Sequence, residues 1–93
     1  MVKRSRKKEK NKLIGFAFIK IEPVSMIKPS YEYIMKNESI VEIHEVTGEY
    51  DLFCKIASTT PDEFRTALDY IRQAKGVKKL DVNISYHQIK PVE

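Results

Sequence analysis

The chain has 93 residues, a single cysteine and a formal net charge of +4, so we expect one small domain without an internal disulfide. No apolar run approaches the roughly 18 residues of a membrane-spanning helix, and none follows the basic N-terminus as in a signal peptide. These features favour a soluble, cytoplasmic protein. A domain of this size buries only about 60–65% of its unfolded surface, which makes self-association a natural source of extra stability.

Positive charge is concentrated at the N-terminus. Residues 1–12 hold seven basic residues and one acidic residue, whereas residues 13–93 hold 10 basic and 12 acidic ones. We interpret residues 1–12 as a flexible basic tail and residues 13–93 as the folded domain. The tail either only keeps the protein soluble or touches nucleic acid weakly and without sequence preference. The residues predicted for such weak contact are Lys3, Arg4, Arg6, Lys7 and Lys8.

The first two predicted elements are a strand and a short helix. Leu13–Glu22 is rich in β-forming residues and is apolar on both faces, which predicts a central strand. Pro29 would interrupt a helix interior but suits a first turn. We therefore predict a helix over about Ser30–Lys36, or one beginning a turn earlier, whose apolar side consists of Tyr31, Ile34 and Met35.

A hairpin is predicted next. Ser39–Val46 alternates, with Val41 and Ile43 on its apolar side, which is typical of a half-exposed strand. Thr47-Gly48-Glu49 then turns the chain, because glycine accepts φ > 0 without a Cβ penalty. Tyr50–Ser58 is again apolar on both faces, which predicts a second central strand.

A helix and a strand complete the domain. Thr60 is placed to cap the helix, Pro61 takes its first position, and Glu63 completes a capping box. Lys75-Gly76 supplies the stop signal. The apolar stripe of the helix, at helical spacing, is Phe64, Ala67, Leu68 and Ile71. The final half-exposed strand alternates Leu80, Val82, Ile84 and Tyr86 with Asp81, Asn83, Ser85 and His87.

The element order β-α-β-β-α-β predicts an α+β, ferredoxin-like fold, which is a four-stranded antiparallel sheet in the order 4-1-3-2. Right-handed crossovers place both helices on one face of that sheet. The opposite face then has no cover from this chain, and a contiguous apolar patch on a small domain signals a partner surface. The residues predicted for this oligomer interface are Phe16, Phe18, Leu52 and Cys54.

The sequence holds little that favours catalysis. Cys54 lies within an apolar strand, where thiols are usually inert. His44 and His87 lie on separate strands without the spacing of a metal site. The chain has three glycines, which form no phosphate-binding loop. We therefore predict no enzyme activity, no cofactor and no metal.

Three stretches, AFIKIEP, IVEIHEVTGEYDLFCKI and GVKKLDVNISYHQIK, resemble the C-terminal RAM domain of the Lrp/AsnC family of feast/famine regulators. The resemblance covers about residues 13–90. Its most specific element is the Gly-acidic-Tyr-Asp turn within Val46–Asp51. It implies the same βαββαβ fold, dimers formed through the sheet and further assembly up to octamers. Full-length members carry a helix-turn-helix domain before this module, and only twelve basic residues precede the first strand here. The resemblance therefore implies a stand-alone module without specific DNA binding.

The resemblance also implies a ligand site. In family members the corresponding turn lines a pocket between subunits where a free amino acid binds. Carried over to Thr47–Asp51, Gly48 and Glu49 would supply backbone donors, Tyr50 a wall and Asp51 a partner for the ammonium group. The alternative is that Asp51 only caps the turn. Many members carry threonine or serine facing the ligand on the last strand. Leu80 and Val82 stand at those positions here, which leaves Asn83 and Ser85 as the nearest polar candidates.

Together these observations predict a stand-alone, amino-acid-sensing module that oligomerises, binds a small amino acid between subunits and modulates transcription indirectly. One alternative is a ligand-free assembly module that forms hetero-oligomers with full-length regulators. The other is a weak nucleic-acid binder that acts through its basic tail.

Overall fold

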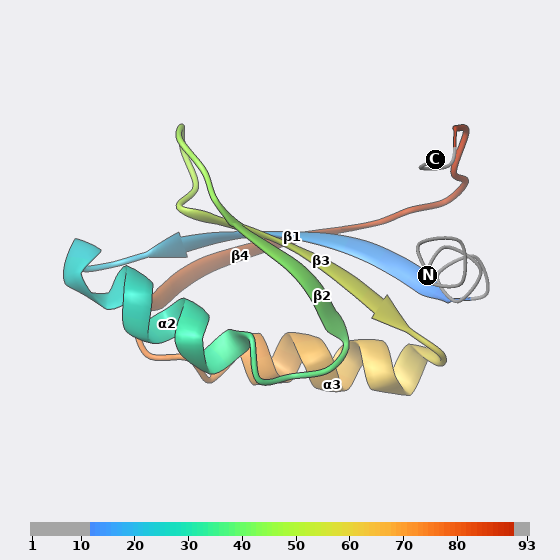
Figure 1. Cartoon of the computed structure of the whole chain (residues 1–93), viewed down its shortest axis with the longest axis horizontal. Helices are drawn as coiled ribbons and strands as arrows, with labels where there is room; N and C mark the ends of the chain where they lie inside the picture. Colours follow the sequence, from blue (N-terminus) through green and yellow to red (C-terminus); the bar gives the residue numbers. More distant parts are fainter. Residues whose placement is uncertain (1–11, 91–93) are drawn as a thin grey trace, which may run out of the picture.

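Four antiparallel strands form one sheet in the order β2-β3-β1-β4, and two helices cover one of its faces (Figure 1). The computed structural model describes residues 12–90. The elements in chain order are β1 (Leu13–Ile21), the 3-10 helix η1 (Val24–Met26), α2 (Ile27–Ile34), β2 (Ile40–Glu45), β3 (Leu52–Ser58), α3 (Pro61–Arg72) and β4 (Val77–Ile84). The predicted ferredoxin-like fold and its strand order are confirmed. The basic residues Lys3, Arg4, Arg6, Lys7 and Lys8 lie outside the described residues.

The core lies between the sheet and the two helices. On β1 every second residue from Gly15 to Ile21 is buried, while the residues between them face the opposite side. Strand alternation produces this division, since successive side chains point to opposite faces. Gly15 admits the ring of Phe64, because a Cβ at that position would collide with it. The largest fully buried apolar side chains are Ile19, Ile21, Ile34, Leu52, Ile56 and Ile71.

Helix α3 begins as its sequence predicts. Thr60 lies at the N-cap with extended backbone, and its hydroxyl accepts a hydrogen bond from the N–H of Glu63 (3.1 Å). The Glu63 carboxylate accepts in turn from the N–H of Thr59 (2.8 Å), so the box closes one residue earlier than in its usual form. The helix ends at Arg72, before the predicted Lys75-Gly76, and Gly76 instead turns the chain into β4 with φ +92°.

Helix α2 begins at Ile27, so Pro29 lies in its first turn, which agrees with the earlier of its two predicted starts. Three other predictions are corrected by the structure. Met35, predicted on the apolar side of this helix, lies beyond its end with 60% of its surface exposed. On β2 the register shifts between Ile40 and Glu42, which leaves Val41 at a bulge and exposed instead of beside Ile43. Strand β4 ends at Ile84, so Tyr86 does not continue its alternation.

Candidate functional site at the open sheet face

The face of the sheet turned away from the helices carries a cluster of aromatic rings. Phe18 pairs with Phe53 across β1 and β3, and their ring centroids lie 5.1 Å apart. Phe16 stacks on Phe53 at 5.9 Å. These three rings, hereafter the aromatic cluster, are half-buried, and Figure 1 shows both helices on the other side of the sheet. Half-exposed aromatic rings at the centre of a sheet form an apolar surface suited to a partner.

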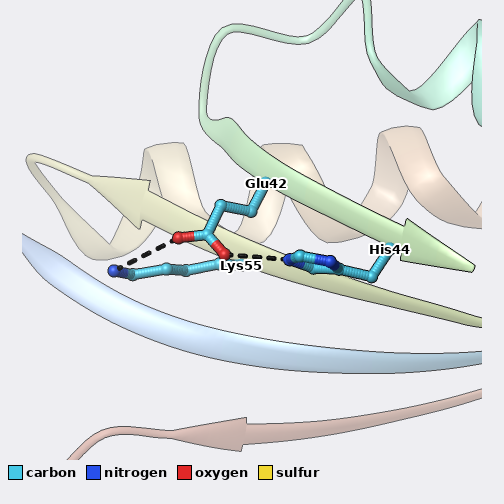
Figure 2. Close-up of polar contacts among 3 residues, drawn as sticks. All are labelled: Glu42, His44 and Lys55. Carbon is cyan, nitrogen blue, oxygen red and sulfur yellow. Dashed lines mark hydrogen bonds and ion pairs between the residues drawn. The ribbon is translucent and has the colours of Figure 1, made fainter. Parts of the chain in front are cut away.

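Polar groups border the aromatic cluster on the β2 side, where Figure 2 shows Glu42 between His44 and Lys55. One oxygen of the Glu42 carboxylate lies 3.1 Å from Nε2 of His44, and the other lies 3.9 Å from Nζ of Lys55. The His44 ring also lies 5.8 Å from that of Phe53. The Lys55 side chain is only 13% exposed, and its ion pair with Glu42 offsets part of the cost of that burial.

A second polar group borders the aromatic cluster on the β4 side. The hydroxyl of Tyr50 donates a hydrogen bond to the Asp81 carboxylate, and Nζ of Lys79 lies 5.6 Å from the centroid of the Tyr50 ring. The hydrogen bond to Asp81 raises the pKa of Tyr50, and contact with the Tyr50 side chain raises the pKa of Lys79. The Tyr50 ring lies 5.8 Å from that of Phe18, so this group adjoins the aromatic cluster.

Sequence reasoning missed Lys79 and Asp81. Asp81 pairs with Phe18 across β1 and β4, and Lys79 pairs with Lys20. Both therefore share the open face with the aromatic cluster, since paired residues point to the same side of a sheet. The alternation on the last strand already places Asp81 on the opposite face from Leu80 and Val82. It does not give the register of β4 against β1, which brings Asp81 beside Tyr50.

The turn between β2 and β3 is built around Gly48, whose φ is +106°. Apart from Gly48 and its two chain neighbours, no residue has an atom within 4 Å of the place where a Cβ would stand. Glycine is therefore favoured there by the backbone conformation and not by crowding. The N–H of Val46 donates to the carbonyl of Asp51 (3.0 Å), which closes the turn. Thr47, Gly48 and Glu49 are exposed at its tip, and Tyr50 is half-exposed.

Asp51 ties this turn to the end of β1. Its carboxylate accepts a hydrogen bond from the N–H of Ile21 (2.7 Å), and its own N–H donates to the carbonyl of Ile19 (2.9 Å). Nζ of Lys20 lies 3.7 Å from the same carboxylate oxygen, and the Asp51 side chain is 19% exposed. A carboxylate that accepts from a backbone N–H is held by a charge-assisted bond. Asp51 therefore has a structural role within the chain, whatever else it binds.

The structure does not bring Asn83 and Ser85 to the turn. Asn83 is exposed and pairs with Phe16, and the N–H of Ser85 donates to the carbonyl of Ile14 (2.8 Å). Asp51 bonds to the carbonyl of Ile19, five residues further along β1, which is about 16 Å at the usual rise of a strand. The polar residues of β4 nearest the turn are instead Lys79 and Asp81.

Leu52 and Cys54, predicted at the oligomer interface, lie on the other face. Both are fully buried within the chain, in the core beneath the helices. Alternation along β3 explains this correction, because it turns Phe53 and Lys55 to the open face and Leu52 and Cys54 to the core. Burial also raises the pKa of the Cys54 thiol to about 12.

No group of three or more histidine, cysteine, aspartate or glutamate side chains within residues 12–90 is arranged to hold a metal ion. His44 has the Glu42 carboxylate beside it, and a single carboxylate and a single imidazole fall short of the usual ligand set. Within the same residues, no helix is both long and apolar enough to cross a membrane.

The fold is a ferredoxin-like domain with an aromatic cluster on its open face, and comparison with known proteins identifies its family. Residues 15–92 match the model of the Lrp/AsnC ligand binding domain. The chain belongs to this family, as its sequence resemblance implied.

Individual relatives agree with this assignment. The chain is 28% identical over 79 residues to an uncharacterised HTH-type transcriptional regulator of Pyrococcus abyssi (strain GE5 / Orsay), covering 82% of this chain and 53% of that protein. Its fold is similar to that of E. coli AsnC, with a TM-score of 0.82 and 13% identity over 95% of this chain and 60% of that one. It is also similar to a transcriptional regulator from Neisseria meningitidis in complex with L-Met, with a TM-score of 0.74 and 20% identity over 84% and 52% of the two chains. The chain spans about half the length of the curated relatives it matches.

Proposed function

We propose that this chain is an amino-acid-sensing regulatory module that self-associates through its open sheet face, binds a small amino acid at the subunit interface and modulates transcription indirectly. The observation that carries the proposal is the aromatic cluster, which the helices leave uncovered and which adjoins the β2–β3 turn through Tyr50. The family match supports a ligand-binding role, and the similar regulator in complex with L-Met supports an amino acid as the ligand. The relative described as a transcriptional regulator supports a regulatory role and not an enzymatic one.

The chemistry around the turn suits a zwitterion. Backbone amides at the turn tip, from Gly48 and Glu49, are donors for an α-carboxylate. Asp51 remains the proposed partner for the ammonium group, and its bond to Ile21 would have to be shared with the ligand. Lys79 and Asp81 add one cation and one anion beside Tyr50. A second copy placed on the open face would enclose these groups and strengthen their interactions by excluding water.

A ligand-free assembly module is the second candidate, and the bonding of Asp51 favours it. The carboxylate is already satisfied by the N–H of Ile21 and neighbours the ammonium of Lys20, so the turn is complete without an effector. In this role the chain would act only by joining its own copies or those of full-length regulators.

A thermal-shift screen of the intact chain against the twenty amino acids separates the two candidates. A ligand that binds only the folded state stabilises it by RT ln(1 + [L]/Kd), which is about 2.7 kcal/mol at a hundredfold excess over Kd. We expect a subset of L-amino acids to raise Tm in proportion to the logarithm of their concentration. The matched control is the amide of each active amino acid, which lacks the carboxylate. No shift with any amino acid, in a protein that still self-associates, would favour the assembly module.

A further inference from the structure

The segment that follows β4 exposes apolar side chains. This C-terminal arm, residues 85–90, carries Tyr86, which is 101% exposed, and Ile89, which is 87% exposed, and it follows Ile84, which is 55% exposed. The N–H of Ser85 donates to the carbonyl of Ile14, which holds the root of the arm against β1. Ile84 pairs with Gly15 and so lies on the helix side of the sheet. Tyr86 and Ile89, three residues apart on the arm, are the exposed apolar side chains that favour contact with a partner.

The arm and the β2–β3 turn lie at opposite ends of the open face. Figure 1 shows both rising from the sheet on the side away from the helices, with the arm in red at one end and the turn in green at the other. The aromatic cluster lies on the part of the sheet between them, where β1 pairs with β3. The open face therefore lies between the turn and the arm.

A second copy of this chain is the occupant that covers the open face and the arm together. A stable interface usually buries about 800 Å² on each partner, and a fully buried aromatic side chain supplies about 150–250 Å² of that area. The rings of the aromatic cluster are already half-buried, so they provide only part of the required area. In a pair related by a two-fold axis, each copy seated on the open face would lie alongside the other copy's arm. The exposed side chains of both arms would then add to the interface.

We propose that the arm is a clasp between copies: Tyr86 and Ile89 of each chain pack against the second copy seated on its open face and set the strength of the dimer. This inference rests on the proposed self-association through the open face. It adds a separate contact, made by residues outside the sheet.

The first test compares the intact chain with the double variant Tyr86→Ser and Ile89→Ser by sedimentation velocity over a dilution series. We expect the dimer dissociation constant to rise about tenfold or more, because two apolar side chains lose their burial in each copy. The circular dichroism spectrum should not change, since both residues are exposed in the single chain. The matched control is Val24→Ser with Met35→Ser, which removes two apolar side chains exposed by 77% and 60% outside the sheet. Its dissociation constant should stay within about twofold of the original.

The outcomes distinguish the clasp from the assembly on which it rests. A dimer whose dissociation constant is unaffected by Tyr86→Ser with Ile89→Ser overturns the clasp and leaves self-association intact. An intact chain that sediments as a monomer at all concentrations overturns both. An equal loss in the control pair would show a general effect of apolar residues and would also overturn the clasp.

The second test locates the arm. A spin label attached at Gln88→Cys keeps Tyr86 and Ile89 in place, and the buried Cys54 should not react under native conditions. Labelled chains without isotope are mixed with unlabelled ¹⁵N chains, so that any broadening of amide signals crosses between copies. We expect broadening in the ¹⁵N chains, at residues of the open-face side. If broadening occurs only when label and isotope are in the same chain, the arm folds onto its own sheet and the proposal is wrong.

Discussion

The Asp51 carboxylate is compatible both with a structural role in the turn and with a role in binding a ligand. Its bonds to Ile21 and Ile19 fasten the turn to the end of β1. A residue required by the fold gives no evidence of a ligand by its presence alone. Only its effect on ligand-induced stability can separate the two roles.

We expect Asp51→Ala to lower the free energy of unfolding by about 1–3 kcal/mol, because the N–H of Ile21 loses its acceptor. Urea titration measures this loss. The matched control is Asp81→Ala, which removes an exposed carboxylate bonded to the Tyr50 hydroxyl and should change stability by less than about 0.5 kcal/mol. If Asp51 also binds effector, the ligand-induced rise in Tm shrinks in its variant. Equal rises in the variant and the original chain would contradict the binding role and retain the structural one.

Cys54 should be unreactive in the folded chain. Its side chain is fully buried, and burial raises its pKa to about 12, so the reactive thiolate is scarce. We expect a chromogenic disulfide reagent at pH 8 to react slowly with the native protein and at once with the urea-unfolded protein. Rapid reaction of the native chain would contradict the burial of the thiol.

The raised pKa of Cys54 also has a consequence for stability. Above the ordinary thiol pKa of about 8.5, the unfolded state releases its proton while the folded state retains it. Cys54 should therefore lower stability progressively as the pH rises from that value toward about 12. The matched variant Cys54→Ala should lose less stability over the same alkaline range in urea titrations. A parallel pH dependence of the two proteins would show that the thiol does not contribute.

At the level of the elements, periodicity predicted which segments are strands and helices, but not where each one ends. Helix α3 was the clearest case, because its cap, its first-turn proline and its apolar stripe all agree. Val41 was misplaced because a bulge interrupts the alternation of β2, and nothing in the local pattern marks that extra residue. The alternation of β4 extends to Tyr86 in the sequence, yet the strand ends at Ile84. The pairing of β4 with β1 ends at Ile84 and Gly15, so the extent of pairing and not the pattern limits the strand.

Removing the cap of α3 should weaken the whole domain. Thr60→Ala leaves the N–H of Glu63 without its side-chain acceptor and should cost about 1 kcal/mol, within a usual range of about 0.5–2. Thr59→Ala is the matched control, since the exposed Thr59 bonds to Glu63 through its backbone N–H, which alanine retains. Urea denaturation followed at 222 nm compares the two variants. Equal losses would show that the Thr60 hydroxyl contributes no more than an exposed threonine.

At the scale of the molecule, the strand order decides how much of the site could be predicted. Alternation alone places Phe16 and Phe18 on one side of β1, and the predicted order correctly makes that strand central. The partners of Tyr50 could not be obtained in this way. Asp81 is separated from it by 31 residues, and their contact depends on the register of β4 against β1 and on the path of the turn. Patterns within a segment predict faces, whereas contacts between segments require the registers.

Self-association through the open face can be tested with one charged substitution. Phe16 is half-buried in the single chain, where it stacks on Phe53, and a second copy on this face would bury it completely. Phe16→Asp would then place a charge without a partner in a dry interface, which costs far more than leaving it in water. We expect the variant to fold, with a native circular dichroism spectrum, and to sediment as a monomer at concentrations where the original chain is a dimer or a larger oligomer.

The control for Phe16→Asp is Met35→Asp, which adds the same charge at an exposed apolar residue just after α2. It should leave the oligomer unchanged. If the oligomers of both variants dissociate, the cause is net charge, since added charge repels other copies wherever it lies. A Phe16→Asp variant that remains fully assembled would place the interface on another surface, and the aromatic cluster would then need a different partner.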